Sequence, residues 1–307
     1  MVRTRSFGWT DLPVSVIGYG PMALSLHGRP DTRDAVEMLE SVIAAGVTFL
    51  DTADTYCLGP DELHHNEQLI GQVLQRHSQV MVGTKGGTLR TATGWQLDGH
   101  PERLYQAIVE SHAALGGREP IFLWQHHWPD PRWTIAQMLH PVQRALDEKL
   151  IRYVGVGNYT LEQLQAACDL VPVLTVQNQY NLWHREPKTN GIFDWCVDRR
   201  LVFLPYRPLG GAELANRLGE IPELALIARD RGISPQQLTI AWHLAQSPCL
   251  LPIPGARNPE HFQDCLKAAA IELEPHELKM LNGLRPESLP QLKRATNWSD
   301  HPPLSPR

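Results

Sequence analysis

Side chains suited to proton transfer stand directly after short apolar segments of this sequence. Asp51 follows the mostly apolar residues 47–50, and Tyr56 comes shortly after it in "FLDTADTY". Lys85 ends the next such segment, "VMVGTK", and His127 comes just after a third one, "IFLWQH". A carboxylate at the end of a buried strand lowers stability unless a partner compensates for its charge. We therefore expect a functional site where these segments end.

The four side chains have complementary roles in acid–base chemistry. A tyrosine has a pKa of about 10 in water, which makes it a poor proton donor at neutral pH. An ammonium such as that of Lys85 favours the phenolate and lowers this pKa, and Asp51 can hold the ammonium in place. An imidazole can orient a carbonyl oxygen. This set predicts that Tyr56 protonates an oxygen while a hydride reaches the carbon bound to it, which completes the reduction of a carbonyl group.

Two pairs of adjacent histidines raise the question of a metal site. His126 and His127 lie at the end of a predicted strand, where successive side chains point to opposite faces, so we expect them to diverge. His64 and His65 lie in a predicted loop, with no third ligand in view. We therefore predict no metal site.

The composition narrows the class of protein. The 307 residues are 42% hydrophobic and 20% charged, with a formal net charge of -5, which is typical of a globular protein and disfavours non-specific binding to nucleic acid. The five cysteines form no C-x-x-C pair, which suits a reducing compartment. No apolar run reaches the ~18 residues of a membrane span, and the N-terminus lacks the apolar region of a signal peptide. We expect a cytoplasmic protein with no membrane or nucleic-acid partner.

Segments typical of strands alternate with segments typical of helices along the chain. Strands are predicted over 12–20, 47–50, 80–85, 121–126, 151–157, 173–178, 201–206 and 250–255. Helices are predicted over 32–45, 66–76, 101–116, 134–149, 160–169, 191–200 and within 213–246, with more after the last strand. Such alternation implies a parallel sheet. Eight units fit an α/β fold, the closed (β/α)8 TIM barrel, whose active site lies at the carboxyl ends of the strands.

The domain organisation is predicted to be simple. We expect a single domain over 1–307, with a short N-terminal extension and an irregular, Pro-rich C-terminal tail over 285–307. A Rossmann fold is the main alternative, because "GYGPMA" (18–23) matches the dinucleotide-binding pattern after a strand. In a Rossmann fold a helix begins within this glycine loop, whereas residues 24–31 are typical of a loop and precede the first predicted helix. This disfavours the alternative.

Seven stretches in order along the chain resemble the aldo-keto reductase family, from about residue 12 to 270. They are "FLDTADTY", "GTKGG", "QHHWPDP", "IRYVGVGNYT", "VQNQYNL", "PYRPLGG" and "IPGARNPEHFQD". The resemblance implies reduction of an aldehyde or ketone by NADPH. It also implies that Tyr56 is the general acid, that Lys85 lowers its pKa, that Asp51 positions Lys85, and that His127 orients the substrate carbonyl.

The same resemblance implies a set of cofactor-binding residues, from the nicotinamide to the adenosine 2′-phosphate. These are Gly20, Met22, Asp51, Asn158, Gln177, Tyr206, Arg207, Pro208, Leu209, Gly211, Gly255, Arg257, His261 and Asp264. Three departures affect the expected binding: Gly157 and Arg207 each replace a common Ser, and Cys265 replaces a common Asn. The last loop also lacks the family's usual Lys-Ser pair. Preference for NADPH over NADH then rests largely on Arg257, helped by His261.

Two alternatives to a reductase stay open at this point. Lys85 could form a Schiff base in an aldolase, and the family resembles regulatory channel subunits that bind a nucleotide without turnover. Met22, Trp95 and Trp128 are expected to line the substrate pocket. Their apolar character favours a hydrophobic aldehyde or ketone, with sugars and pyridoxal-like aldehydes also open. The sequence does not indicate the oligomeric state.

Overall fold

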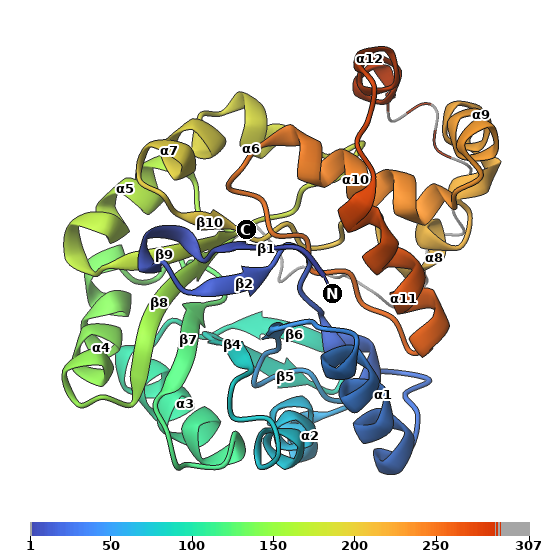
Figure 1. Ribbon diagram of the computed structural model, residues 1–307. Helices are drawn as coiled ribbons and strands as arrows, with labels where there is room; N and C mark the ends of the chain where they lie inside the picture. Colours follow the sequence, from blue (N-terminus) through green and yellow to red (C-terminus); the bar gives the residue numbers. More distant parts are fainter. Residues whose placement is uncertain (1, 286, 288, 290–307) are drawn as a thin grey trace.

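The barrel wall is built from six parallel strands. The computed structural model describes residues 2–285, 287 and 289. Neighbouring strands follow the order β10-β9-β8-β7-β4-β3 (Figure 1). They are β3 (Phe49–Asp51), β4 (Met81–Gly86), β7 (Ile121–His126), β8 (Ile151–Gly157), β9 (Val173–Gln177) and β10 (Val202–Phe203). Six of the predicted strands are thereby confirmed, although β10 is much shorter than the expected 201–206.

Two further segments, the first around Gly18 and Gly20 and the second from Leu250 to Pro254, close the ring without forming full ladders. The backbone N–H groups of Gly18 and Gly20 donate to the carbonyls of Pro252 and Pro254, at 2.9 and 3.1 Å. Isolated bridges join the first of these segments to β3 and the second to β10. Because a proline has no N–H to donate, the eighth segment cannot complete a ladder. The eight predicted segments therefore form a closed (β/α)8 barrel.

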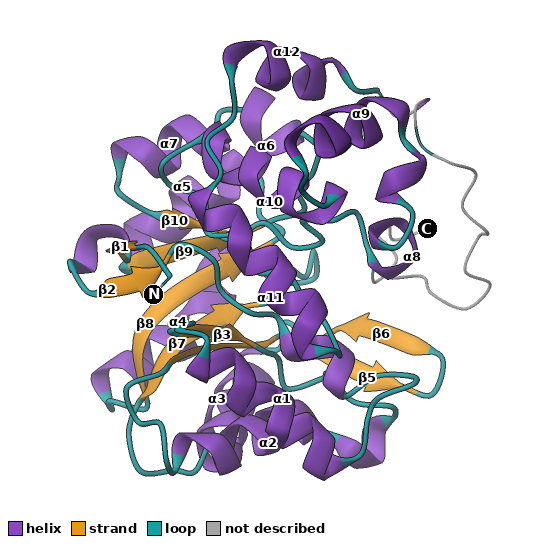
Figure 2. Ribbon diagram, turned by 45° about the vertical axis from the view of Figure 1, so that its right-hand side comes forward, coloured by secondary structure: helices purple, strands orange, loops and turns teal. Residues whose placement is uncertain are grey.

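Helices surround the strands, as Figure 2 shows in purple around the orange sheet. They are α1 (Thr32–Ala44), α2 (His65–Leu74), α3 (Pro101–Ala114), α4 (Ile135–Asp147), α5 (Leu161–Leu170), α6 (Glu186–Thr189), α7 (Ile192–Asp198), α8 (Ala212–Ala215), α9 (Pro222–Arg231), α10 (Pro235–Gln246), α11 (Pro259–Lys267) and α12 (Pro275–Gly283). The predicted starts at 134 and 160 are confirmed. At each of them a threonine caps the helix and a glutamine three residues on completes a capping box.

The N-terminal part of the chain forms a hairpin that the sequence did not predict. The expected strand over 12–20 divides: β2 (Pro13–Ser15) pairs antiparallel with β1 (Thr4–Ser6), and only the following residues enter the barrel. Phe7, in the hairpin loop, is fully buried, and its ring lies 5.2 Å from that of Phe49 on β3. The N-terminal extension therefore packs on the interior of the barrel.

A second unpredicted hairpin follows β4, formed by β5 (Thr88–Thr91) and β6 (Gly94–Leu97). It places Thr88 and Trp95 beside the loop that carries Tyr56, because the indole Nε1 of Trp95 donates to the carbonyl of Thr55 at 3.3 Å. Most of the predicted tail over 285–307 lies outside the described residues. Within the described part of the chain, every helix is too short or too polar to cross a bilayer.

Candidate active site

A buried ion pair joins the ends of two neighbouring strands. Asp51 ends β3 and Lys85 lies near the end of β4, and these strands pair in parallel. The Lys85 Nζ lies 2.6 Å from Asp51 Oδ2 and donates to the carbonyl of Thr52 at 2.7 Å. The two side chains are only 1% and 3% exposed. Burial alone lowers the pKa of Lys85, but Asp51 and Tyr56 outweigh it and the pKa is raised, so Lys85 is an ammonium.

Tyr56 lies against this ammonium. Its hydroxyl is 3.3 Å from Lys85 Nζ, and the ring centroid is 5.0 Å from the same nitrogen. Burial raises the pKa of Tyr56, the Lys85 ammonium lowers it, and Asp51 raises it again, with a net increase. The ammonium thus lowers the pKa of Tyr56, as predicted, but the pKa is raised overall because desolvation is the larger effect. Tyr56 is consequently a neutral phenol that holds its proton.

The two adjacent histidines diverge, as predicted. His126, on β7, is fully buried and lies 2.8 Å from the hydroxyl of Tyr159 through Nδ1. His127 instead lies edge to face with Tyr56, with ring centroids 6.2 Å apart. Burial, helped by the charges of Lys85 and His126, holds the pKa of His127 well below its ordinary value. The imidazole beside Tyr56 is therefore neutral. Asp51, Tyr56, Lys85 and His127 are thus brought together.

Two glutamines complete the surroundings of Asp51, and neither of these contacts was predicted. The Nε2 groups of Gln125 and Gln177 both donate to Asp51 Oδ1 at 2.9 Å. Gln125 is fully buried and Gln177 is 4% exposed. Asp51 therefore has Lys85 on one oxygen and two amides on the other, which fixes its orientation. In the sequence, each of these glutamines stands at the end of an apolar segment. This position was the only signal that could have indicated their contact with Asp51.

Asn158, directly after β8, contacts His127, and Tyr206, shortly after β10, contacts Asn158. Asn158 Nδ2 donates to the carbonyl of His127 at 3.0 Å, and the Tyr206 hydroxyl donates to Asn158 Oδ1 at 3.0 Å. A Cβ atom at the preceding Gly157 would lie 2.7 Å from the same His127 carbonyl oxygen. This contact gives a physical reason for glycine where the resemblance led us to expect serine.

The remaining cofactor-binding candidates form separate groups. Arg207 (φ 51) and Gly211 (φ 104) bend the backbone between β10 and α8. Arg257 is exposed, and its guanidinium donates to the carbonyls of Ala23 and His27, at 3.0 and 2.5 Å. Pro208 and Leu209 are buried within the bend, whereas Gly20 and Gly255 are near-neighbours at the barrel closure and His261 is exposed on α11.

Asp264, the predicted contact to the adenine, is engaged within the protein. It accepts hydrogen bonds from Ser234 Oγ and Gln237 Nε2, and both donors belong to the start of α10. A further hydrogen bond to a ligand would use a remaining lone pair of the carboxylate. Asp264 therefore joins α11 to α10, whatever it contacts in a complex.

The predicted substrate residues lie on three separate segments, a 3-10 turn, strand β6 and the residues after β7. Met22, in a 3-10 turn (Pro21–Leu24), is 38% exposed. Trp95 stacks under the Arg90 guanidinium, 4.1 Å from the ring centroid, and Trp128 follows His127 and is partly exposed. Within the described residues, no group of three metal-ligating side chains is found.

Comparison with known proteins gives consistent results. The sequence model of the Aldo/keto reductase family matches residues 16–286. An uncharacterised oxidoreductase of Schizosaccharomyces pombe is 32% identical over 268 residues, which are 86% of this chain and 84% of the relative. Pyridoxine 4-dehydrogenase of Escherichia coli is 28% identical over 286 residues, 89% of this chain and 96% of that protein. A Klebsiella pneumoniae aldo-keto reductase, solved in complex with NADPH, has a TM-score of 0.79 at 25% identity and covers 95% of this chain and 98% of its own.

Proposed function

The chain belongs to the aldo/keto reductase family of oxidoreductases, and from this premise we propose that it reduces an aldehyde or ketone to the alcohol with NADPH. The observation that carries the proposal is the contact between the Tyr56 hydroxyl and the Lys85 ammonium, at 3.3 Å, with Asp51 at 2.6 Å from the same nitrogen. Tyr56 is the general acid, and Asp51, Lys85 and His127 assist it.

The residues at the strand ends suit a nicotinamide dinucleotide. The Tyr206 ring beside the Asn158 amide offers a flat surface and polar partners for a nicotinamide with its carboxamide. Gln177 uses its Nε2 on Asp51, which leaves Oε1 to accept from the carboxamide. Nothing lies within 4 Å of a Cβ position at Gly211, so a pyrophosphate fits against the backbone there, and Arg207 supplies positive charge in the same turn.

The preference for NADPH rests on Arg257. It is an exposed guanidinium held by two backbone carbonyls, and a guanidinium is well suited to a phosphate. The Klebsiella pneumoniae relative was solved with NADPH, which supports the same choice. NADH, which lacks the 2′-phosphate, is the less favoured cofactor.

The chemistry follows from the protonation states of the side chains. When bound, NADPH supplies the hydride that reaches the carbonyl carbon. Tyr56 gives its phenolic proton to the carbonyl oxygen, and the Lys85 ammonium stabilises the phenolate that remains. His127, which is neutral, donates an N–H to the same oxygen and so orients the substrate. Substrate carbon gains a hydride and substrate oxygen gains a proton, which gives the alcohol.

The aldolase alternative conflicts with the state of Lys85. A Schiff base requires a neutral amine as nucleophile, whereas the Asp51 carboxylate holds Lys85 as an ammonium. The alternative of a nucleotide sensor is distinguished by turnover. Repeated oxidation of NADPH by one enzyme molecule in the presence of an aldehyde would exclude a purely sensing role.

The proposed function is tested by the variant Tyr56→Phe. We expect NADPH oxidation, followed by absorbance with a panel of aldehydes, ketones and pyridoxal, to fall by roughly 10²- to 10⁴-fold. NADPH binding, measured by fluorescence titration, should change little, because the hydroxyl acts on the substrate. Tyr153→Phe is the matched control, since Tyr153 packs with Trp9 and Phe122 away from Lys85. Normal turnover in Tyr56→Phe would refute the assignment.

A further inference from the structure

A cavity of about 210 Å³ lies at the amino ends of the barrel strands, away from the candidate active site. It is bounded by β1, by α7, by the start of β10 and by the loop before the eighth barrel segment, and Figure 1 shows β1 near β10 at this end of the barrel. Two cysteines, Cys196 and Cys249, are among its lining residues. Cys196 is fully buried and Cys249 is 8% exposed. The proposed function uses neither thiol.

The backbone holds these two cysteines close together. The carbonyl of Cys196 accepts from the N–H of Leu201, and the carbonyl of Cys249 accepts from the N–H of Phe203, each at 2.8 Å. Residues two positions apart in a chain are separated by at most roughly 7 Å. Each thiol is also the largest single influence on the pKa of the other, which requires that the sulfur atoms be near one another. The two thiols are therefore neighbours on the wall of one cavity.

The guanidinium of Arg5 spans Cys249. It donates to the carbonyl of Pro248 at 2.7 Å and to the carbonyl of Leu250, which are the residues on either side of Cys249. Burial lowers the pKa of Arg5 to about 10, so the side chain is still a cation at neutral pH. Among the described residues, the Cys249 thiol is the one ionisable neighbour that favours this positive charge. A cation held beside a thiol in turn favours the thiolate.

Ser247 supports the same state of Cys249. Its hydroxyl oxygen accepts from the N–H of Cys249 at 3.4 Å and lies 3.2 Å from Cys249 Sγ. Because the oxygen serves the backbone as acceptor, its one proton is free to be donated to the sulfur.

The two thiols differ in how readily they ionise. The pKa of Cys249 is lowered, with Cys196 as the largest cause. Burial opposes this decrease, and Ser247 and Arg5 add to it. The pKa of Cys196 is raised well above its ordinary value by Cys249 and by burial. Cys249 is therefore the nucleophile of the pair, and Cys196 is the thiol that keeps its proton.

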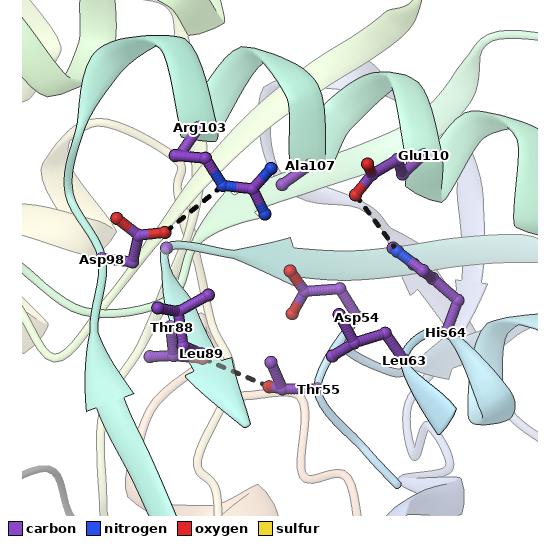
Figure 3. Close-up of a pocket in the computed structure, with 11 residues that line it drawn as sticks. Asp54, Thr55, Leu63, His64, Thr88, Leu89, Asp98, Arg103, Ala107 and Glu110 are labelled. Carbon is purple, nitrogen blue, oxygen red and sulfur yellow. Dashed lines mark hydrogen bonds and ion pairs between the residues drawn. The ribbon is translucent and has the colours of Figure 1, made fainter. Parts of the chain in front are cut away.

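Cys57 has the opposite environment. It lies in the loop that carries Asp54 and Thr55, where Figure 3 shows the Asp54 carboxylate pointing into a second, smaller cavity. Cys57 Sγ donates to the carbonyl of Gly59 at 3.2 Å. Burial raises the pKa of Cys57 to about 11, Arg90 opposes the rise, and Asp54 adds to it. Cys57 is therefore an internal reference of low reactivity.

We propose that Cys249 and Cys196 form a peroxide-reactive site, in which Cys249 is oxidised first and Cys196 then closes a disulfide with it. Arg5 is a positioning residue that favours the reactive form of Cys249. Hydrogen peroxide is the co-reactant, and a cavity of about 210 Å³ admits it, since a water molecule takes up only about 30 Å³. The proposal does not depend on the proposed function.

The reaction has two steps. The Cys249 thiolate attacks one oxygen of hydrogen peroxide, the O–O bond breaks, and the hydroxide that leaves takes up the proton that Cys249 had lost. Cys249 is then a sulfenic acid. The sulfur of Cys196 attacks the sulfur of Cys249, the S–O bond breaks, and the hydroxide that leaves takes the Cys196 proton. In sum, two thiols are oxidised to one disulfide, and one peroxide is reduced to two waters.

Peptide mass spectrometry tests the proposal on the full-length chain. The reduced protein is treated with hydrogen peroxide, its remaining thiols are blocked, and it is digested with trypsin. Cleavage after Lys and Arg places Cys196 in peptide 189–199 and Cys249 in peptide 232–257. A disulfide between them joins these two peptides, and the product is lighter than their sum by two hydrogen atoms.

In the wild type we expect these two peptides to become joined while Cys57 stays reduced. The pKa of Cys57 is about 11, whereas that of Cys249 is below the ordinary 9.0. Two pKa units change the thiolate fraction about 100-fold, and the greater nucleophilicity of the more basic thiolate recovers about 10-fold of this. Oxidation of Cys249 should therefore be roughly 10-fold faster than that of Cys57, or more.

Four variants separate the roles. In Cys196→Ser, Cys249 should form a sulfenic acid that dimedone traps, and in Cys249→Ser, Cys196 should stay reduced. Arg5→Gln should bring the oxidation rate of Cys249 closer to that of Cys57, and Arg5→Lys, which keeps the positive charge, should retain most of the difference. The readout is the ratio of the two cysteines within one protein, so an overall change in stability does not imitate the effect.

Three results would overturn the proposal. The first is oxidation of wild-type Cys249 no faster than that of Cys57, a result that requires no variant to fold. The second is a disulfide from Cys196 to Cys168, recognised by peptide 153–185, with Cys249 left reduced. The third is an unchanged ratio in Arg5→Gln, which would mean that Arg5 does not activate Cys249. Absence of carbonyl reduction would overturn the proposed function and leave this test unaffected.

Discussion

The free energy of unfolding of the wild-type protein should fall between pH 5 and pH 8, and the substitution Asp54→Asn should remove most of this fall. Burial raises the pKa of Asp54 from its ordinary 3.8 to about 8, so the folded protein binds this proton more tightly than the unfolded chain. The stabilisation from the proton is then fully present below about pH 4 and is lost as the pH rises through about 8. Asparagine has no proton to lose in this range.

The size of the effect follows from the two pKa values. Each pKa unit of difference between the folded and the unfolded state corresponds to about 1.4 kcal/mol of stability. Between pH 5 and pH 8 the unfolded chain has lost the Asp54 proton and the folded protein mostly retains it. The free energy of unfolding should therefore fall by about 4 kcal/mol more in the wild type than in Asp54→Asn over these three units. Coupling to His64 and Glu67, which act on the same carboxyl, makes this an upper bound.

Urea unfolding at several pH values between 5 and 8 measures the effect. The quantity of interest is the change with pH, because the asparagine amide adds an offset that does not depend on pH. Asp61→Asn is a suitable control, since Asp61 is an exposed acid close to the same loop and its replacement should leave the slope unchanged. Stabilities of wild type and Asp54→Asn that run in parallel across this range would refute the reasoning.

Two other substitutions probe the site. Lys85→Met should lower the free energy of unfolding, measured in urea, by about 3–5 kcal/mol, because it leaves the buried Asp51 carboxylate without its cation. A smaller loss in the double variant Asp51→Asn/Lys85→Met would confirm this cause. An unchanged urea midpoint in Lys85→Met would contradict it. Arg257→Ala should weaken NADPH binding by roughly 10-fold or more and NADH binding much less, given the strength of a guanidinium–phosphate contact; fluorescence titration with both cofactors checks this, and equal losses would mean that Arg257 does not contact the 2′-phosphate.

The apolar segments and the residues after them were sufficient to predict the barrel and the grouping of Asp51, Tyr56, Lys85 and His127 at its strand ends. The contact between Asp51 and Lys85 follows from adjacent strands whose carboxyl ends meet, and alternation along β7 separates His126 from His127. These inferences depend only on periodicity and chain order. The prediction that the whole chain forms one domain stays a prediction, as do the roles assigned to individual cofactor-binding residues.

Other features depend on packing that the sequence pattern does not contain. Pro13 reads as part of a strand, but nothing local shows that β2 pairs with β1 instead of entering the barrel. The net rise in the pKa of Tyr56 depends on how many groups cover it. The contact between the Thr55 and Thr88 hydroxyls depends on two rotamers in separate elements, and the sequence around these threonines has no pattern that predicts it.

The contacts that close the barrel join residues from opposite ends of the chain. Asp51, Lys85 and His127 can meet as soon as the first half of the chain has left the ribosome. The contacts of Gly18 and Gly20 with Pro252 and Pro254 must wait until nearly the whole polypeptide has been synthesised, and closing so long a loop is entropically unfavourable. Asp51, Lys85 and His127 are therefore synthesised well before the chain can complete the joint beside Gly255, where the cofactor is expected to bind.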